Sequence, residues 1–246
     1  MSGNATSKRQ KHRFAPIPSN SSSSQQNNSM KLKGIIFDMD GTLCEPQNYM
    51  FGEMRDAVGI PKGSDILDYI HGLPAEKQET AFTKVQEIER RAMSKQIPQA
   101  GLVSLMEFLD EHRIPKGICT RNFDAPVTHL LSTHLPSHIN PFSPIITRDF
   151  RPPKPSPAGL LHIGHAWGVT ESAAVPSSPP EGRLLPLIMV GDSIDDMIAG
   201  HDAGALTVLL RSEGKEELER DERTHVVVSR LDELVDLLRE GLSAAR

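Results

Sequence analysis

The sequence has few cysteines and no long apolar run. Cys44 and Cys119 are its two cysteines among 246 residues. Two thiols are too few for a disulfide framework, and no signal-peptide pattern opens the chain. The longest apolar run, residues 184–190, is interrupted by Pro186 and falls short of the roughly 18 residues that a membrane span requires. We therefore expect a protein of a reducing intracellular compartment, with no membrane partner.

Acidic residues are absent from the first 33 positions, which hold six of the 27 basic side chains. The rest of the chain carries the other 21 basic groups against all 32 acidic ones, a net charge of −11. A body this acidic lacks the broad positive field that binding to a phosphate backbone requires. Nucleic acid is therefore not expected as a main partner.

Residues 1–30 are rich in serine, asparagine and glutamine and contain almost no apolar anchors. Such a segment cannot bury enough surface to offset the entropy of ordering, so we interpret it as a disordered tail. The absence of acids also fits a mitochondrial presequence, and the basic cluster at residues 8–13 fits a nuclear signal. Because no clear amphipathic helix is present, we expect a solvated tail on a cytoplasmic protein.

From residue 31 onward, short continuous apolar runs alternate with helical segments. We expect strands at 33–37, 117–119, 144–146, 187–190, 206–210 and 226–228. Helices are expected between them at 102–112, 126–134, 156–167, 195–203 and 232–242. Continuous apolar strands are typical of a sheet covered on both faces, and their alternation with helices predicts parallel strands. The fold class is therefore α/β, with a Rossmann-like parallel sheet sandwiched by helices over residues 31–42 and 100–246.

Two stretches break this alternation. Residues 43–99 offer no convincing strand and a long helical candidate at 75–95, so we expect an all-helical cap inserted after the first strand. Residues 171–183 hold three prolines and three serines, which predicts a flexible surface loop before the strand at 187–190.

A pair of carboxylates, Asp38 and Asp40, stands at the end of the first expected strand, in the sequence DMDGT. Parallel α/β sheets bind ligands at the carboxyl ends of their strands. Two acids facing one pocket repel each other, so such a pair indicates a cation, a shared proton or exposure to water. A solvated Asp-Gly turn is the alternative. An EF-hand calcium loop does not fit, because Tyr49 stands where that loop needs a bidentate acid.

A second acidic cluster, Asp192, Asp195 and Asp196, follows another fully apolar strand. Asp192 or Ser193 can cap the helix that begins here, but capping accounts for one acid and not for three. Hard oxygen ligands from two strand ends, with room for waters and a phosphate, fit magnesium better than zinc.

Two further strand ends offer groups suited to a phosphoryl group. Thr120 follows the strand at 117–119, and Lys154 precedes the helix at 156–167. A hydroxyl donates a hydrogen bond to phosphoryl oxygens, and an ammonium neutralises their charge. Taken singly, each is more simply interpreted as a strand-end hydroxyl or a solvated loop lysine.

Together, in this order and at these strand ends, the four segments resemble the motifs of the haloacid dehalogenase superfamily, whose members are mostly magnesium-dependent phosphatases. DMDGT resembles the first motif of the family, Thr120 the second, and Lys154 in KPSP the third. Asp192 and Asp196 in GDSIDD resemble the fourth. The resemblance spans residues 33–240, and the helical insert stands where the family has a small cap. The overall pattern is most similar to the phosphoglycolate-phosphatase-like branch, including poorly characterised fungal members.

The resemblance implies phosphoryl transfer in two steps. Asp38 would attack phosphorus to form an aspartyl phosphate, while Asp40 would protonate the leaving alcohol and then activate water. Mg²⁺ would be held by Asp38, by the backbone carbonyl of Asp40 and by Asp192, with Asp196 or Asp195 beside its water shell and Ser193 nearby.

The remaining implied contacts concern the substrate. Thr120 and Lys154 would bind the phosphoryl oxygens. Arg121 stands where the family often has a smaller or neutral residue, and it would add a contact to a phosphate or carboxylate group of the substrate. The substrate implied is a small phosphorylated metabolite. Glu45, Gln47, Tyr49, Phe51 and Arg55 of the cap are candidates to contact it, and ordinary cap surface and packing is the alternative for each. The alternatives are a phosphomutase of the same superfamily and a non-catalytic domain that binds a phosphorylated ligand. No obligate protein partner is inferred.

Overall fold

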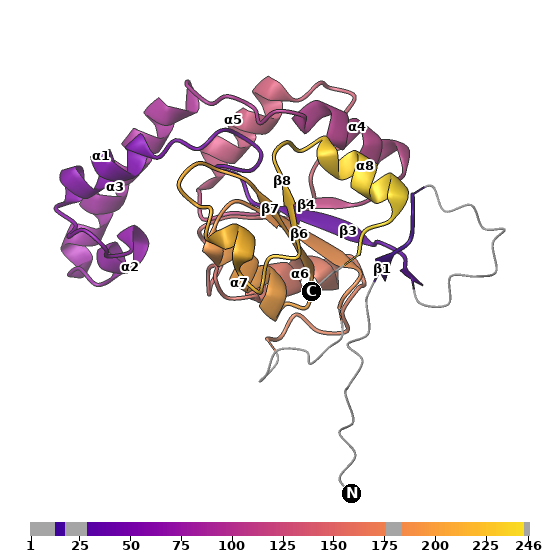
Figure 1. The fold of residues 1–246 in the computed structure, drawn as a ribbon. Coiled ribbons are helices and arrows are strands. Elements are labelled where there is room, and N and C mark those ends of the chain that lie inside the picture. The colour runs from indigo at the N-terminus through magenta and orange to yellow at the C-terminus, as the bar shows by residue number, and fades with distance from the viewer. Residues whose placement is uncertain (1–12, 18–28, 176–183, 244–246) are drawn as a thin grey trace, which may run out of the picture.

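A computed structural model describes residues 13–17, 29–175 and 184–243. Its centre is a six-stranded sheet in which every neighbouring pair of strands is parallel (Figure 1). The strand order is β5-β4-β3-β6-β7-β8, with β3 at Gly34–Phe37, β4 at Lys116–Cys119, β5 at Ile145–Ile146, β6 at Leu187–Gly191, β7 at Leu206–Leu210 and β8 at Val226–Val228. These strands confirm the expected parallel α/β sheet.

Helices cover both faces of the sheet. Successive side chains of a strand point to opposite faces, and all four residues of β3 are buried, so both faces need a covering layer. Ile35 and Phe37 of β3 share a buried cluster with the helices on one face, and Ile36 shares a second cluster with the helices on the other. The first face carries α4 (Leu102–Glu111), α5 (Asp124–His134) and α8 (Glu233–Glu240), and the second carries α6 (Ala158–Ala166) and α7 (Ile194–Asp202) (Figure 1).

The order of the strands reverses beside β3, and this reversal places the site. The chain runs outward from β3 to β4 and β5, then returns to the other side of β3 as β6. In the register, Phe37 lies level with Ile118 of β4 and Val190 of β6. The residues that follow these three strands therefore meet at one edge, where open parallel sheets bind their ligands.

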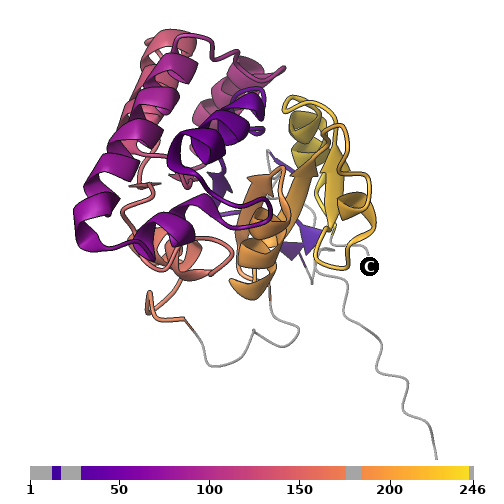
Figure 2. The same cartoon turned by 90° about the vertical axis from the view of Figure 1, so that its left-hand side faces the viewer.

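Residues 43–99 contain three helices and no strand, which confirms the all-helical insert. The helices are α1 (Tyr49–Val58), α2 (Ile66–His71) and α3 (Ala75–Met93). They pack together through a buried cluster of their own that includes Met50, Ile70 and Val85. Figures 1 and 2 show this insert, here called the cap, beside the sheet as a separate helical layer. Within the described ranges, no helix combines the length and apolarity needed to cross a membrane.

The N-terminal segment is partly ordered, so the prediction of a disordered tail over residues 1–30 is wrong for part of it. β1 (Arg13–Phe14) pairs in parallel with β2 (Ser29–Met30). Phe14 is 1% exposed, and its backbone N–H donates to the Leu242 carbonyl at 2.6 Å. One buried ring anchors a segment whose average composition is polar. Positions 1–12 and 18–28 of the predicted tail, and 176–183 of the predicted loop, lie outside the described residues.

Candidate active site

The carboxylates of Asp38 and Asp192 lie close together at the carboxyl ends of β3 and β6. The chain turns sharply after Asp40 at Gly41, whose φ is 80°. A Cβ atom at Gly41 would lie 2.3 Å from Asp192 Oδ2. Glycine at this position therefore permits both the left-handed turn and the close approach of the two strand ends.

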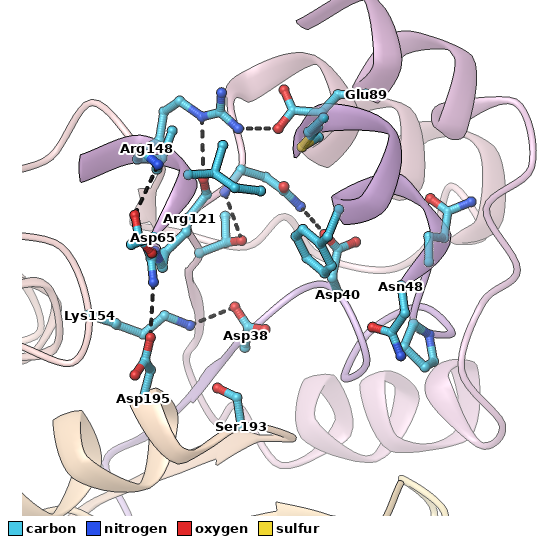
Figure 3. Close-up of a pocket in the computed structure, with 18 of the residues that line it drawn as sticks. Asp38, Asp40, Asn48, Asp65, Glu89, Arg121, Arg148, Lys154, Ser193 and Asp195 are labelled. Atoms are coloured by element: carbon cyan, nitrogen blue, oxygen red, sulfur yellow. Dashed lines mark hydrogen bonds and ion pairs between the residues drawn. The ribbon is translucent and has the colours of Figure 1, made fainter. Parts of the chain in front are cut away.

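Lys154 lies between two buried carboxylates. Its Nζ is 2.6 Å from Asp38 Oδ1 (Figure 3). The same Nζ is 2.5 Å from Asp196 Oδ1. Burial opposes the charge of the lysine, but the carboxylates of Asp196 and Asp38 outweigh burial and raise the pKa of Lys154. The ammonium therefore provides a fixed positive charge beside Asp38.

Asp38, Asp192 and Asp196 each bring a carboxylate oxygen to within 4.8 Å of the others. Burial raises the pKa of Asp38 to about 8 despite the opposing charge of Lys154. Burial, with the charge of Asp196, also raises the pKa of Asp192. Buried acids so close together favour a cation, and their hard oxygen donors suit magnesium. The residues present therefore fit a Mg²⁺ ion.

Asp196 fixes the start of α7. Its Oδ2 accepts hydrogen bonds from the backbone N–H (3.1 Å) and hydroxyl (2.6 Å) of Ser193, and the hydroxyl in turn faces the Asp196 backbone N–H. Its Oδ1 accepts from Lys154. Because protein groups engage both of its carboxylate oxygens, Asp196 is placed to hold Lys154 rather than to stand as a free ligand. Ser193 is the helix cap that the sequence allowed.

Asp40 faces a different set of groups from Asp38. Its Oδ2 accepts a hydrogen bond from Asn122 Nδ2 at 2.7 Å, and its Oδ1 accepts a weaker one from the Cys44 thiol at 3.5 Å. Burial raises the pKa of Asp40, and the Asn122 hydrogen bond opposes that rise. The Asp40 carboxylate lies outside the three-carboxylate cluster, so the site keeps one acid apart from the others.

Thr120 and Arg121 follow β4 but serve different contacts. Thr120 is buried, and its Oγ1 accepts a hydrogen bond from the Asn122 backbone N–H at 3.2 Å. Arg121 pairs with Asp65 of the cap, and its Nη1 lies 3.0 Å from Asp195 Oδ2. Arg121 thus joins the cap to the core. Asp195, expected near the metal, is directed to this ion pair instead.

Comparison with known proteins identifies the family of this site. Residues 32–204 match the haloacid dehalogenase-like hydrolase family. The chain belongs to the haloacid dehalogenase-like hydrolases. This hydrolase is 43% identical over 211 residues to an uncharacterized hydrolase of Saccharomyces cerevisiae, covering 84% of this chain and 91% of that protein. It is 34% identical over 200 residues to a haloacid dehalogenase-like hydrolase domain-containing protein of Arabidopsis thaliana, covering 77% of this chain and 75% of that one.

A solved structure shares the fold of this hydrolase. A protein of Haemophilus somnus described as a predicted phosphoglycolate phosphatase matches it with a TM-score of 0.63 and 16% identity, covering 84% of this chain and 97% of that one. At this identity the likeness concerns the fold alone. Together with the family match, it confirms the resemblance that the four motifs indicated.

A cavity of about 370 Å³ lies between the cap of this hydrolase and its core. It is lined by the predicted site residues Asp38, Asp40, Thr120, Arg121, Lys154, Asp192, Ser193 and Asp195. Among the cap residues expected to contact substrate, Gln47, Phe51 and Arg55 line the cavity, whereas Glu45 and Tyr49 do not. The volume suits a small substrate.

Eleven other residues line the cavity of this hydrolase without a role predicted from sequence, among them Glu89, Asn122, Arg148 and Lys215. Lys215 Nζ donates to the Asp192 carbonyl at 3.0 Å and pairs with its carboxylate. Glu89 of α3 and Arg148, which follows β5, form a buried ion pair between cap and core (Figure 3). Burial raises the pKa of Glu89 to about 7 although Arg148 opposes it. Asn122 stands two residues after Thr120 of the second motif. The other three named residues lie outside the four motifs, so only the fold brings them to the site.

Proposed function

We propose that this hydrolase is a magnesium-dependent phosphatase that cleaves a small phosphorylated metabolite through an aspartyl phosphate on Asp38. The observation that carries the proposal is the contact of Lys154 Nζ with Asp38 at 2.6 Å, inside a cluster of three buried carboxylates. A buried carboxylate that attacks an anionic phosphate needs positive charge beside it. Lys154 supplies part of that charge, and the carboxylate cluster has the donors to hold more.

In the first step, a carboxylate oxygen of Asp38 bonds to phosphorus while the bond from phosphorus to the leaving oxygen breaks. Asp40 gives its proton to that oxygen, so an alcohol leaves. In the second step, Asp40 takes a proton from a water molecule, and the water oxygen bonds to phosphorus. The bond from phosphorus to Asp38 then breaks, which releases inorganic phosphate and restores the Asp38 carboxylate and the protonated Asp40.

The environment of Asp40 suits both of its roles, as the acid of the first step and the base of the second. Burial raises the pKa of its carboxyl, which favours the protonated form needed to release an alcohol. The hydrogen bond from Asn122 counteracts burial and favours the ionised form needed to activate water. Burial outweighs the hydrogen bond, so the pKa of Asp40 stays above that of a solvated aspartate, a shift in the direction that general acid catalysis requires.

Magnesium, held by Asp38 and Asp192 with Asp196 behind them, would neutralise the charge of the phosphate and of Asp38 when bound. Thr120 and Lys154 would hold the phosphoryl oxygens. Both Arg121 Nη atoms already face carboxylates, so we assign Arg121 to the contact between cap and core and not to the phosphate.

A phosphate-release screen tests this proposal. The purified chain with Mg²⁺ is incubated with a broad panel of phosphomonoesters, next to the Asp38→Asn variant. We expect release from at least one compound by the wild type and loss of that release in Asp38→Asn. Release from no compound, or equal release by the variant, would overturn the proposal. Migration of phosphate within a substrate without release would identify a phosphomutase instead.

A further inference from the structure

We propose that Asn122 is a positioning residue that aims Asp40 at the leaving oxygen, and that the cap holds Asn122 in place through Glu89 and Arg148. The inference rests on the proposed function, because it concerns the acid of that reaction. It assigns a role to three cavity residues that lie outside the predicted set of site residues.

Asn122 is fixed at both its side chain and its backbone. Its Nδ2 donates to Asp40 Oδ2 at 2.7 Å, and the side chain is buried. Its backbone N–H donates to Thr120 Oγ1 at 3.2 Å, and its carbonyl accepts from the Arg148 backbone N–H at 2.8 Å. Two backbone hydrogen bonds fix the position of Asn122, so its buried side-chain amide restricts the orientation of the carboxylate it contacts.

Arg148 holds the loop that carries Asn122 from one side. Besides its backbone hydrogen bond to Asn122, its Nε donates to the Arg121 carbonyl at 3.3 Å. Its guanidinium lies 5.4 Å from the centre of the Phe123 ring. Three successive residues, 121–123, therefore each contact the same arginine.

The cap enters this network at Glu89. Its carboxylate is 3% exposed and pairs with one terminal nitrogen of Arg148. Glu89 Oε2 and Arg148 Nη1 are buried and have no hydrogen-bond partner in the described part of the chain. A bidentate pair would engage both of these atoms. The single contact instead links α3 of the cap to the loop that orients Asp40.

This chain of contacts matters because a general acid works only within hydrogen-bond reach of the atom it protonates. A displacement of about 1 Å in an active site can slow a reaction by roughly 100-fold. The loss of rate caused by a displaced acid depends on the leaving group. A poor leaving group such as an alkoxide must be protonated, whereas a good leaving group such as nitrophenolate need not be.

The test compares kcat/KM for two substrates, because this constant reports only the steps up to departure of the leaving group. The substrates are an alkyl phosphate found in the phosphate-release screen and p-nitrophenyl phosphate. Asn122→Leu keeps the size of the side chain and removes its donor. We expect kcat/KM to fall about 10- to 100-fold for the alkyl phosphate and less than about 3-fold for p-nitrophenyl phosphate.

The cap contribution is tested with Glu89→Gln and Arg148→Lys, for which we expect the same selectivity with a loss of about 3- to 10-fold. Glu53→Gln, which breaks the exposed pair between Glu53 and Arg91 within the cap, is the matched control and should change neither constant. If Asn122→Leu does not fold, Arg148→Lys decides the question.

Equal losses on both substrates would show a merely structural role and overturn the inference. No loss on either substrate, with active wild type, would overturn it as well while leaving the phosphatase intact. Wild-type protein inactive on every compound would instead count against the proposed function, so the two failures are distinguishable.

Discussion

The carboxylate of Asp65 in the cap pairs with the guanidinium of Arg121 in the core, beside the cavity. The same carboxylate begins α2, because its Oδ1 accepts hydrogen bonds from the backbone N–H groups of Leu67 at 2.9 Å and Asp68 at 3.0 Å. Burial opposes its ionisation, but these hydrogen bonds and Arg121 lower the pKa of Asp65 overall. One side chain therefore joins helix capping to the contact between cap and core.

Two substitutions of Asp65 separate these roles. Asp65→Asn keeps an acceptor for the helix cap and loses the ion pair. Since the pair is about one-third exposed, we expect its loss to lower the free energy of unfolding by less than about 1 kcal/mol. Asp65→Ala also removes the cap and should cost about 1 kcal/mol more. Urea unfolding measures both, and a larger loss in Asp65→Asn than in Asp65→Ala would contradict the assignment.

Glu89 predicts a pH dependence of stability. Burial raises its pKa from 4.5 to about 7, against the opposing charge of Arg148. The folded protein therefore holds this proton more tightly than the unfolded chain. The resulting stabilisation is complete below about pH 4.5 and is lost as the pH rises through about 7.

Glu89→Gln removes this titration and leaves the other groups in place. Between about pH 5 and pH 8, without magnesium, the unfolding free energy of the wild type should fall by about 1–3 kcal/mol more than that of Glu89→Gln. The comparison uses the slope with pH, because the variant also changes the pairing of Arg148. Parallel pH profiles would contradict the assigned burial of Glu89.

Magnesium should stabilise the folded chain. At about 100 times the dissociation constant, binding to the native state alone adds about 2.7 kcal/mol, which raises Tm by about 5–10 °C for a chain of this size. Asp192→Asn removes one carboxylate of the cluster and should abolish most of the shift. A thermal melt with and without Mg²⁺ checks this, and an equal shift in Asp192→Asn would place the ion elsewhere.

Phe14 should anchor the N-terminal segment. Its ring is fully buried, so Phe14→Ala should lower the free energy of unfolding by about 3 kcal/mol. Phe51→Ala is the matched control, because Phe51 is 41% exposed and should cost well under about 1 kcal/mol. If Phe14→Ala costs no more than Phe51→Ala in urea unfolding, Phe14 does not anchor the segment.

The parallel sheet could be predicted from the sequence because each strand is a short and largely apolar run, and helical segments alternate with these runs. Val226–Val228 is one such strand with the expected bounds, and the structure places it at one edge of the sheet. Phe14 was missed because average composition hides a single anchoring ring. The order and ends of the strands then brought Asp38, Lys154 and Asp192 together, as the motifs indicated.

The rest of the site could not be predicted because it depends on the position of the cap relative to the core. In the sequence, Glu89 is one of many charged residues on a long amphipathic helix. Only the packing of that helix against the core buries Glu89 beside Arg148. Arg121 follows the strand-end hydroxyl in sequence, which suggested a phosphate contact. Its long side chain instead reaches Asp65, a residue 56 positions away.

The most direct test of the central claim is detection of a phosphoryl group on Asp38. Asp40→Asn is mixed with p-nitrophenyl phosphate and Mg²⁺, quenched in acid and mapped by peptide mass spectrometry. Since nitrophenolate leaves without an acid while hydrolysis needs the base, the account predicts that phosphate accumulates on Asp38 and on no other residue. Phosphate release by the wild type without any label on Asp38, or undiminished release by Asp38→Asn, would contradict it.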